Sequence, residues 1–296
     1  MKNTGVIGLG DMGSGLAKNL IKNGFPVKGF DLSESRMKTF AEMGGKLTSN
    51  PAEVGKDTDA VFVMVMNGSQ MMEVVLNKDG LLSTLKPGSA IILTATIRDN
   101  EVRNLSESLK DSGLHLIDSP VSGGFPGAQE GTLTMMASGE ISVLDEFATV
   151  MQAVSKNIHR VGTEPGMGQT VKACLQSLIG SIFSATFEAS ALAAKAGVNG
   201  QVLYDVFSSS GAGCGVVNNA IEKIIDRKFE GTGSHISTMY KDLSIVLDMS
   251  RELGVPLFTA STAFQLFQAG AAKYPDGDNW AVTRVIEEII DAQLKR

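Results

Sequence analysis

The stretch TGVIGLGDMG, residues 4–13, decides the fold expected of this chain. Its first four residues have the composition of a short buried strand, and residues 14–20 after it favour a helix. The turn between the two carries three glycines with the spacing G-x-G-x-x-G, namely Gly8, Gly10 and Gly13. A strand, a glycine-rich turn and a helix in this order predict the first half of a parallel βαβ unit.

An acidic residue ends the next strand candidate, Val27–Asp31. Asp31 follows Gly13 at close to the spacing of about 20 residues found in dinucleotide-binding units, where the glycines allow close approach of a pyrophosphate to a helix N-terminus. The carboxylate can accept hydrogen bonds from both ribose hydroxyls, and its charge repels a 2′-phosphate. Leu32 stands where an arginine would favour NADP. We therefore expect NAD as the cofactor, with NADP as the less favoured alternative.

The first half of the chain alternates β-prone runs with helical segments, which predicts a parallel sheet covered on both faces. The expected strands are Thr4–Ile7, Val27–Asp31, Ala60–Met66, Ala90–Leu93, Leu114–Asp118 and Leu133–Ala137. The expected helices are Gly13–Asn23, Ser33–Glu42 and Asn100–Ser112. Several strands are apolar at consecutive positions, as in sheets that are buried on both sides.

The pattern changes near residue 163, after which almost no strand signal remains. Gly168–Lys195 lacks proline and is apolar on most faces, so it predicts a long buried helix. Further helices are expected at Gly200–Ser208, Val216–Asp226, Ser237–Leu253, Thr259–Ala272 and Asn279–Lys295. The predicted architecture is an α/β Rossmann-type N-terminal domain, residues 1–163, and an all-α C-terminal domain, residues 164–296, joined by a long helix.

Composition and charge disfavour several classes of function. The net charge is −6 and no basic cluster is present, which disfavours nucleic-acid binding. Cys174 and Cys214 suggest neither a disulfide framework nor a metal site, and the three histidines show no close-set metal pattern. No signal peptide is evident, and polar residues break every long apolar run. We expect a cytoplasmic protein that binds no membrane and no metal.

Four separated motifs resemble the β-hydroxyacid dehydrogenase family, which includes 3-hydroxyisobutyrate, tartronate-semialdehyde and L-threonate dehydrogenases. They are GLGDMG at 8–13, DSPVSGG at 118–124, GMGQTVK at 166–172 with Gln176 one turn later, and KDL at 241–243. The likeness covers nearly the whole chain. It implies hydride transfer at C4 of a nicotinamide, a substrate cleft between the domains, and a homodimer or homotetramer.

Lys172 is the residue expected to transfer the proton, because the resemblance makes the lysine of the third motif the general acid/base. Its neighbours in sequence are mostly apolar, and Gln176 four residues later shares its helix face. Desolvation and the positive end of the helix favour a neutral amine, whereas a substrate carboxylate favours the ammonium. Gln176 is expected to orient the substrate. A lysine with its head in water is the alternative.

The resemblance assigns the substrate carboxylate to Ser122, Gly123 and Gly124, which can present a hydroxyl and two unblocked N–H groups to an anion. An ordinary loop is the alternative. In the first motif the implied cofactor contacts are Gly8, Leu9, Gly10, Asp11, Met12 and Gly13. Further on, Val65, Met66 and Asn67 match a loop on the adenosine side, Thr96 matches a residue beside the nicotinamide, and Lys241 matches a lysine that reaches the active site. A solvated lysine is the alternative for Lys241.

The sequence departs from the family pattern at several positions. Leu93-Thr94-Ala95-Thr96 stands where many members read Asp-x-Ser-Thr, and Leu175 stands where many relatives have asparagine. Small side chains precede Val216 where relatives often carry a bulky group, and Cys214 among them is interpreted as a packing residue. A roomier pocket suggests a substrate of four carbons or more, with a likeness toward the threonate branch.

Two other functions are alternatives to a hydroxyacid dehydrogenase. An imine reductase shares this architecture, but those enzymes usually lack the lysine that stands here as Lys172. A non-catalytic dinucleotide-binding sensor has no need of a proton donor, so the joint presence of Ser122, Lys172 and Gln176 argues against it. Hydride transfer between NAD and a small hydroxy acid is the function we expect.

Overall fold

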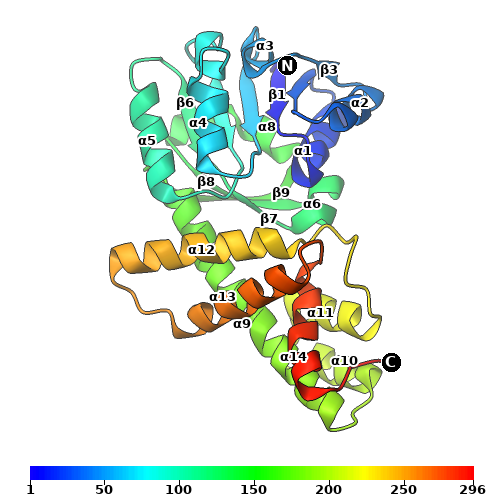
Figure 1. The fold of residues 1–296 in the computed structure, drawn as a ribbon. Helices are drawn as coiled ribbons and strands as arrows, with labels where there is room; N and C mark the ends of the chain where they lie inside the picture. The colour runs from blue at the N-terminus through cyan, green and yellow to red at the C-terminus, as the bar shows by residue number, and fades with distance from the viewer. The chain divides into compact units, whose positions relative to one another are not determined.

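The computed structural model describes all residues from 1 to 296, and the chain divides into two compact units, Met1–Lys172 and Ala173–Arg296. Figure 1 traces the α/β elements of the first unit and the helices of the second. The expected combination of a Rossmann-type region followed by a helical region is confirmed. Helix α9, Met167–Lys195, is continuous from the end of the first unit into the second.

The first unit contains a nine-stranded sheet with the order β3-β2-β1-β4-β5-β6-β8-β7, in which β9 pairs with β8. The strands are β1 Thr4–Ile7, β2 Val27–Phe30, β3 Lys46–Leu47, β4 Ala60–Val63, β5 Ala90–Leu93, β6 His115–Asp118, β7 Val121–Ser122, β8 Leu133–Ser138 and β9 Ser155–Gly162. From β3 to β6 every pairing is parallel, whereas β8 runs antiparallel to both β6 and β7. The strand order reverses at β1 and β4, which is where α/β sheets of this type bind ligands.

Helices cover the sheet on both faces. They are α1 Asp11–Lys22, α2 Glu34–Glu42, α3 Pro51–Gly55, α4 Gly68–Leu76, α5 Asp99–Leu109, α6 Gly124–Glu130, α7 Ile141–Glu146 and α8 Ala148–Gln152, with the 3-10 turn η1 Leu81–Ser83. In β4, Phe62 joins the core cluster that contains Leu16 of α1, while Val61 and Val63 join the cluster that contains Leu105 of α5. All four β4 residues are buried, which explains the uninterrupted apolar run in the sequence.

The second unit contains only helices. They are the later part of α9, then α10 Gly200–Ser209, α11 Gly215–Ile225, α12 Ile236–Leu253, α13 Phe258–Lys273, the 3-10 turn η2 Asn279–Val282 and α14 Thr283–Ile290. Its core is rich in aromatic residues. Phe183 of α9 stacks on Phe187 with ring centroids 5.7 Å apart and meets Trp280 edge-on at 6.1 Å.

By length and composition alone, α9 is apolar enough to cross a membrane, and 44% of its most apolar window is buried inside the protein. A core helix meets the same criteria. Phe183 and Phe187 of α9 belong to the aromatic core of the second unit, and the same helix buries the polar side chains of Gln169 and Gln176. Phe183 and Phe187 therefore pack as part of the core of the second unit.

Some elements of the structure differ from those predicted from the sequence. Strand β9 was not expected, because five of its eight residues are polar or charged and four are exposed. The helix expected at Asn279–Lys295 is a 3-10 turn followed by α14, which ends at Ile290. Asp291 then takes the left-handed conformation with φ 50°, and the chain turns back to bury Leu294.

Candidate functional site

The turn after β1 accepts only glycine at two positions. Gly8 has φ +86°, and an added Cβ would stand 2.2 Å from the Met64 carbonyl oxygen. A Cβ on Gly13 would stand 1.7 Å from the Gly8 carbonyl oxygen, so α1 packs directly against the turn. No side chain caps the N-terminus of α1, because its N-cap residue is Gly10. The helix end with its N–H groups suits a pyrophosphate, as the G-x-G-x-x-G motif predicts.

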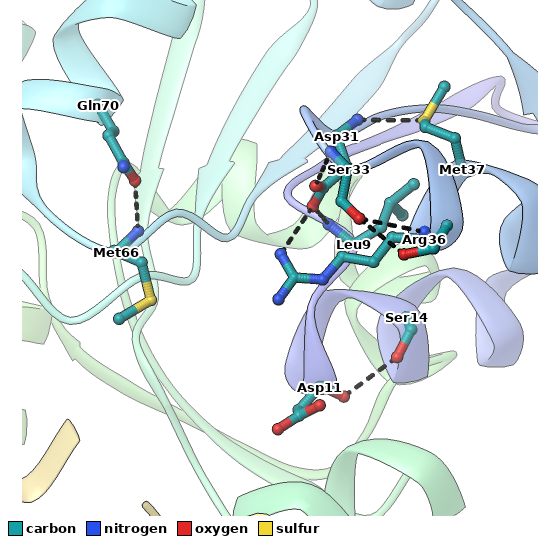
Figure 2. Close-up of polar contacts among 10 residues, drawn as sticks. Leu9, Asp11, Ser14, Asp31, Ser33, Arg36, Met37, Met66 and Gln70 are labelled. Carbon is teal, nitrogen blue, oxygen red and sulfur yellow. Dashed lines mark hydrogen bonds and ion pairs between the residues drawn. The ribbon is translucent and has the colours of Figure 1, made fainter. Parts of the chain in front are cut away.

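Asp31 lies one residue beyond β2 and joins the glycine turn to the next loop. Its Oδ2 accepts a hydrogen bond from the Leu9 N–H at 2.7 Å, and its Oδ1 accepts one from the Ser33 N–H at 2.8 Å (Figure 2). The side chain is only 8% exposed. Each carboxylate oxygen has a second acceptor site, so the group fits the two hydroxyls of an adenosine ribose.

Arg36 of α2 is a residue that the sequence analysis missed. Its Nη1 lies 3.5 Å from Asp31 Oδ2, and its side chain is 55% exposed. Three guanidinium atoms lie 3.7–3.8 Å from the position of a Cβ on Gly10. The expectation of NAD rests on Asp31 and on Leu32, which is 90% exposed, and leaves Arg36 out. The sequence feature that could have indicated Arg36 is a basic residue near the start of the helix that follows β2.

The loop after β4 contains Val65, Met66 and Asn67, which were expected on the adenosine side. Asn67 is the N-cap of α4, and its side-chain oxygen accepts a hydrogen bond from the Gln70 N–H at 2.9 Å. The Gln70 side chain in turn accepts one from the Met66 N–H at 2.9 Å (Figure 2). These two hydrogen bonds fix the conformation of the loop. The side-chain oxygen of Asn67 is already bonded to the Gln70 N–H within the protein.

The second motif runs from the end of β6 into α6. Ser122 is in β7, paired with Thr134 of β8. Gly123 and Gly124 have φ 128° and 59°, a backbone that side-chain-bearing residues adopt only with strain. Ser119 is fully buried and its hydroxyl has no hydrogen-bond partner. The pair of left-handed glycines fits a loop that presents backbone to a ligand.

Lys172 is in the second turn of α9, and its exposure is 7%. A turn earlier, Gln169 is 1% exposed and donates from Nε2 to Asp118 Oδ1 at 2.8 Å. Asp118, at the end of β6, also accepts the Gln169 backbone N–H at 3.2 Å. Burial raises the pKa of the Asp118 carboxyl to about 6, although hydrogen bonds from Gln169 and from the Gly168 and Gly166 backbone oppose the shift.

In the second unit, Gln176 and Lys241 meet the same carboxylate. Gln176 Nε2 donates to Asp242 Oδ2 at 2.6 Å, and Lys241 Nζ lies 3.0 Å from Asp242 Oδ1. Asp242 is 3% exposed, whereas the Lys241 side chain is 27% exposed. The fourth motif includes Asp242, but the sequence analysis gave it no role. The sequence feature that could have indicated Asp242 is its position directly after the lysine of the motif.

The structure thus joins the predicted site residues in three groups. The glycine turn is bonded to Asp31, the α9 turn before Lys172 is bonded to the end of β6, and Gln176 is bonded with Lys241 to Asp242. No group of three His, Cys, Asp or Glu side chains is placed to hold a metal ion. Cys214, interpreted as a packing residue, is exposed as the N-cap residue of α11, so that interpretation is wrong.

Comparison with known proteins identifies both halves of the chain. Residues 3–162 match the NAD binding domain of 6-phosphogluconate dehydrogenase, and residues 166–286 match the NAD-binding region of NADP-dependent 3-hydroxyisobutyrate dehydrogenase. The L-threonate dehydrogenase of Escherichia coli O6:H1 is 35% identical over 97% of this chain and 95% of its own length. The mitochondrial 3-hydroxyisobutyrate dehydrogenase of Mus musculus is 30% identical over 96% of this chain and 87% of its own.

Among solved structures, 3-hydroxyisobutyrate dehydrogenase from Salmonella typhimurium superimposes with a TM-score of 0.88 at 32% identity. The superposition covers 96% of this chain and all of that one. Matches over both halves, together with whole-length relatives above 30% identity, show the family and the use of a nicotinamide dinucleotide. The chain belongs to the β-hydroxyacid dehydrogenase family and is a hydroxyacid dehydrogenase.

Proposed function

We propose that this chain transfers a hydride between NAD and a small hydroxy acid, and that Lys172 is the general acid/base. The observation that carries the proposal is a lysine only 7% exposed in the second turn of α9, within the motif that the family uses for proton transfer. A buried lysine at this position in the motif supports a role in proton exchange with a substrate hydroxyl.

The bound dinucleotide supplies the hydride acceptor at C4 of its nicotinamide. The neutral amine of Lys172 accepts the hydroxyl proton during oxidation, and its ammonium returns a proton to the developing alkoxide during reduction. Ser122, Gly123 and Gly124 hold the substrate carboxylate through a hydroxyl and backbone N–H groups. Gln176 orients the substrate, and its own amide is fixed by the bond to Asp242.

The substrate class we propose is that of threonate, tartronate semialdehyde and 3-hydroxyisobutyrate, all short acids with a hydroxyl or carbonyl near the carboxylate. The 35% identity to an L-threonate dehydrogenase favours the polyhydroxy member. A panel of short hydroxy acids, followed through NADH formation at 340 nm, tests the class. No turnover with any of them would refute the proposed activity.

The proton-transfer role is tested with Lys172→Met, which keeps the length of the side chain and removes the amine. We expect kcat to fall by about 100- to 10,000-fold, the range that general acid/base catalysis contributes. NADH affinity, measured by fluorescence titration, should stay near wild type. Lys156→Met in β9 is the control, because Lys156 is an exposed lysine and should leave turnover unchanged. Wild-type kcat in Lys172→Met would end the assignment.

We infer a preference for NAD over NADP from the Asp31 carboxylate, which would face a 2′-phosphate at close range. Arg36 weakens this repulsion, because its guanidinium lies 3.5 Å from the same carboxylate. Asp31→Ser should raise kcat/KM for NADP relative to NAD by at least tenfold, or about 1.4 kcal/mol. Arg36→Leu should shift the ratio in the opposite direction. A wild-type enzyme that prefers NADP would overturn this part of the proposal.

We also propose a homodimer or homotetramer located in the cytoplasm, following the family resemblance. Neither membrane nor nucleic acid has a part in this function. Sedimentation equilibrium over a range of protein concentrations tests the assembly, and a monomer at all concentrations would contradict it.

A further inference from the structure

The side-chain amide of Gln169 makes three hydrogen bonds within the first unit. Its Oε1 accepts the Ile97 N–H at 3.0 Å, and its Nε2 donates to the Ala95 carbonyl oxygen at 3.0 Å and to Asp118 Oδ1 at 2.8 Å. With an exposure of 1%, the amide is removed from water. Since both Nε2 hydrogens and the oxygen are engaged, its orientation is fixed.

Two of these partners are the backbone groups on either side of Thr96. Just before Thr96, the N–H groups of Thr94 and Ala95 still bond to the Val63 carbonyl oxygen of β4. Beyond that point the amide of Gln169 both donates and accepts, as a peptide group of a neighbouring strand would. The Gln169 side chain therefore continues the hydrogen bonding of the sheet beyond the end of β5. Its bonds to Ala95 and Ile97 fix the backbone on both sides of Thr96.

The third partner connects this loop to the start of α9. Asp118 accepts both the side-chain amide and the backbone N–H of Gln169, so its buried carboxylate caps the helix N-terminus. Gly168 packs here too, since an added Cβ would stand 2.9 Å from Asp118 Oδ2. The loop after β5, the end of β6 and the first turn of α9 thus meet at one side chain. Lys172 follows three residues later.

We propose that Gln169 is a positioning residue that sets the distance between Thr96, beside the nicotinamide end of the cofactor site, and the helix turn that carries Lys172. The inference rests on the proposed function, because it takes Thr96 and Lys172 as the residues nearest the reaction. Gln169 touches neither the cofactor nor the substrate in this role. It acts through the backbone on each side of Thr96 and through the first turn of α9.

Hydride transfer depends steeply on the placement of the reacting groups, and a shift of about 1 Å can cost about 100-fold in rate. Gln169→Met keeps the volume of the side chain and removes all three hydrogen bonds. We expect kcat to fall by about 100-fold, and the kinetic isotope effect with substrate deuterated at the hydroxyl carbon to rise as the chemical step becomes slower. NADH affinity should fall relative to the affinity for ADP-ribose, which lacks the nicotinamide.

A measurement on the protein without cofactor tests the hydrogen bonds of Gln169 directly. Hydrogen exchange in the peptide that contains Thr94–Arg98 should accelerate in Gln169→Met, because the Ile97 N–H loses its acceptor. Val150→Ala in α8 is the matched control, since Val150 is fully buried in the other core cluster of this unit and its loss lowers stability alone. The control should leave the isotope effect and the NADH to ADP-ribose ratio at wild-type values.

The proposal is overturned if Gln169→Met exchanges its Thr94–Arg98 amides at the wild-type rate, or if its isotope effect and affinity ratio match those of Val150→Ala. Should Gln169→Met fail to fold, Gln169→Asn gives the same readouts, because its shorter amide cannot span both backbone groups. A wild-type chain inactive with every hydroxy acid would refute the proposed function instead. The exchange and ADP-ribose measurements would still decide the role of Gln169.

Discussion

Asp118 gives the stability of the first unit a distinctive dependence on pH. Its side chain is 1% exposed, and burial raises the pKa of the carboxyl from the ordinary 3.8 to about 6. Between these two pH values the folded chain holds a proton that the unfolded chain releases. The contribution of Asp118 to the free energy of unfolding is therefore largest in acid and falls as pH rises through 6, the opposite of an ordinary salt-bridged carboxylate.

The linkage relation gives the size of this effect. With a folded pKa of about 6 and an unfolded value of 3.8, lowering the pH from 7 to 5 adds about 1 kcal/mol to the stability of the first unit through Asp118 alone. Other carboxylates change over the same range, so the comparison must be made with a variant that lacks only this group. Asp118→Asn removes the titration and keeps the shape of the side chain.

Trp280, the single tryptophan, lies in the second unit, so tryptophan fluorescence does not follow this transition. Urea unfolding monitored by hydrogen exchange in peptides from β5 and β6 follows the first unit directly. The wild-type advantage over Asp118→Asn should grow by about 1 kcal/mol from pH 7 to pH 5. Parallel stability profiles for the two proteins, or an advantage that shrinks in acid, would refute the reasoning about this carboxyl.

Two further substitutions examine the cofactor turn and the helical core. Gly13→Ala places a methyl group 1.7 Å from the Gly8 carbonyl oxygen, so NADH affinity in a fluorescence titration should fall at least tenfold; unchanged affinity would show that α1 can move away. Phe187→Ala removes a fully buried ring that stacks on Phe183, and should lower the free energy of unfolding of the second unit by about 3–5 kcal/mol in tryptophan-monitored denaturation. A loss below 1 kcal/mol would contradict this account of the aromatic core.

Much of the fold could be predicted from local pattern. The apolar runs of β1 and β5 coincide with the expected strands, and α12 begins within a residue of its prediction, because burial on defined faces leaves a direct signature in the sequence. Strand β9 has no such signature. Its residues are ordered by pairing with β8, a tertiary contact that local propensity does not reveal.

The residues of the candidate site likewise divide into those that the sequence predicts and those that it does not. The glycine turn and Asp31 follow from a motif whose spacing has a direct physical meaning, whereas Lys172 follows from the family resemblance. Gln169 and Asp118 do not follow from either, because they act through partners distant in sequence. Arg36 was missed although its partner Asp31 is only five residues away. Gln169 and Asp118 were present in the quoted motifs, yet only the folded chain shows that one amide reaches the backbone 72 and 74 residues away.

The bonds from Asp31 to Leu9 and Ser33 have a consequence for recognition. A free aspartate side chain samples several rotamers, and immobilising such a group during association costs roughly 0.5–1.5 kcal/mol. Here folding itself has already met that entropic penalty, since two backbone N–H groups hold the carboxylate in one orientation. A nucleotide therefore encounters a preorganised acceptor, and more of the enthalpy of its ribose contacts remains available as affinity.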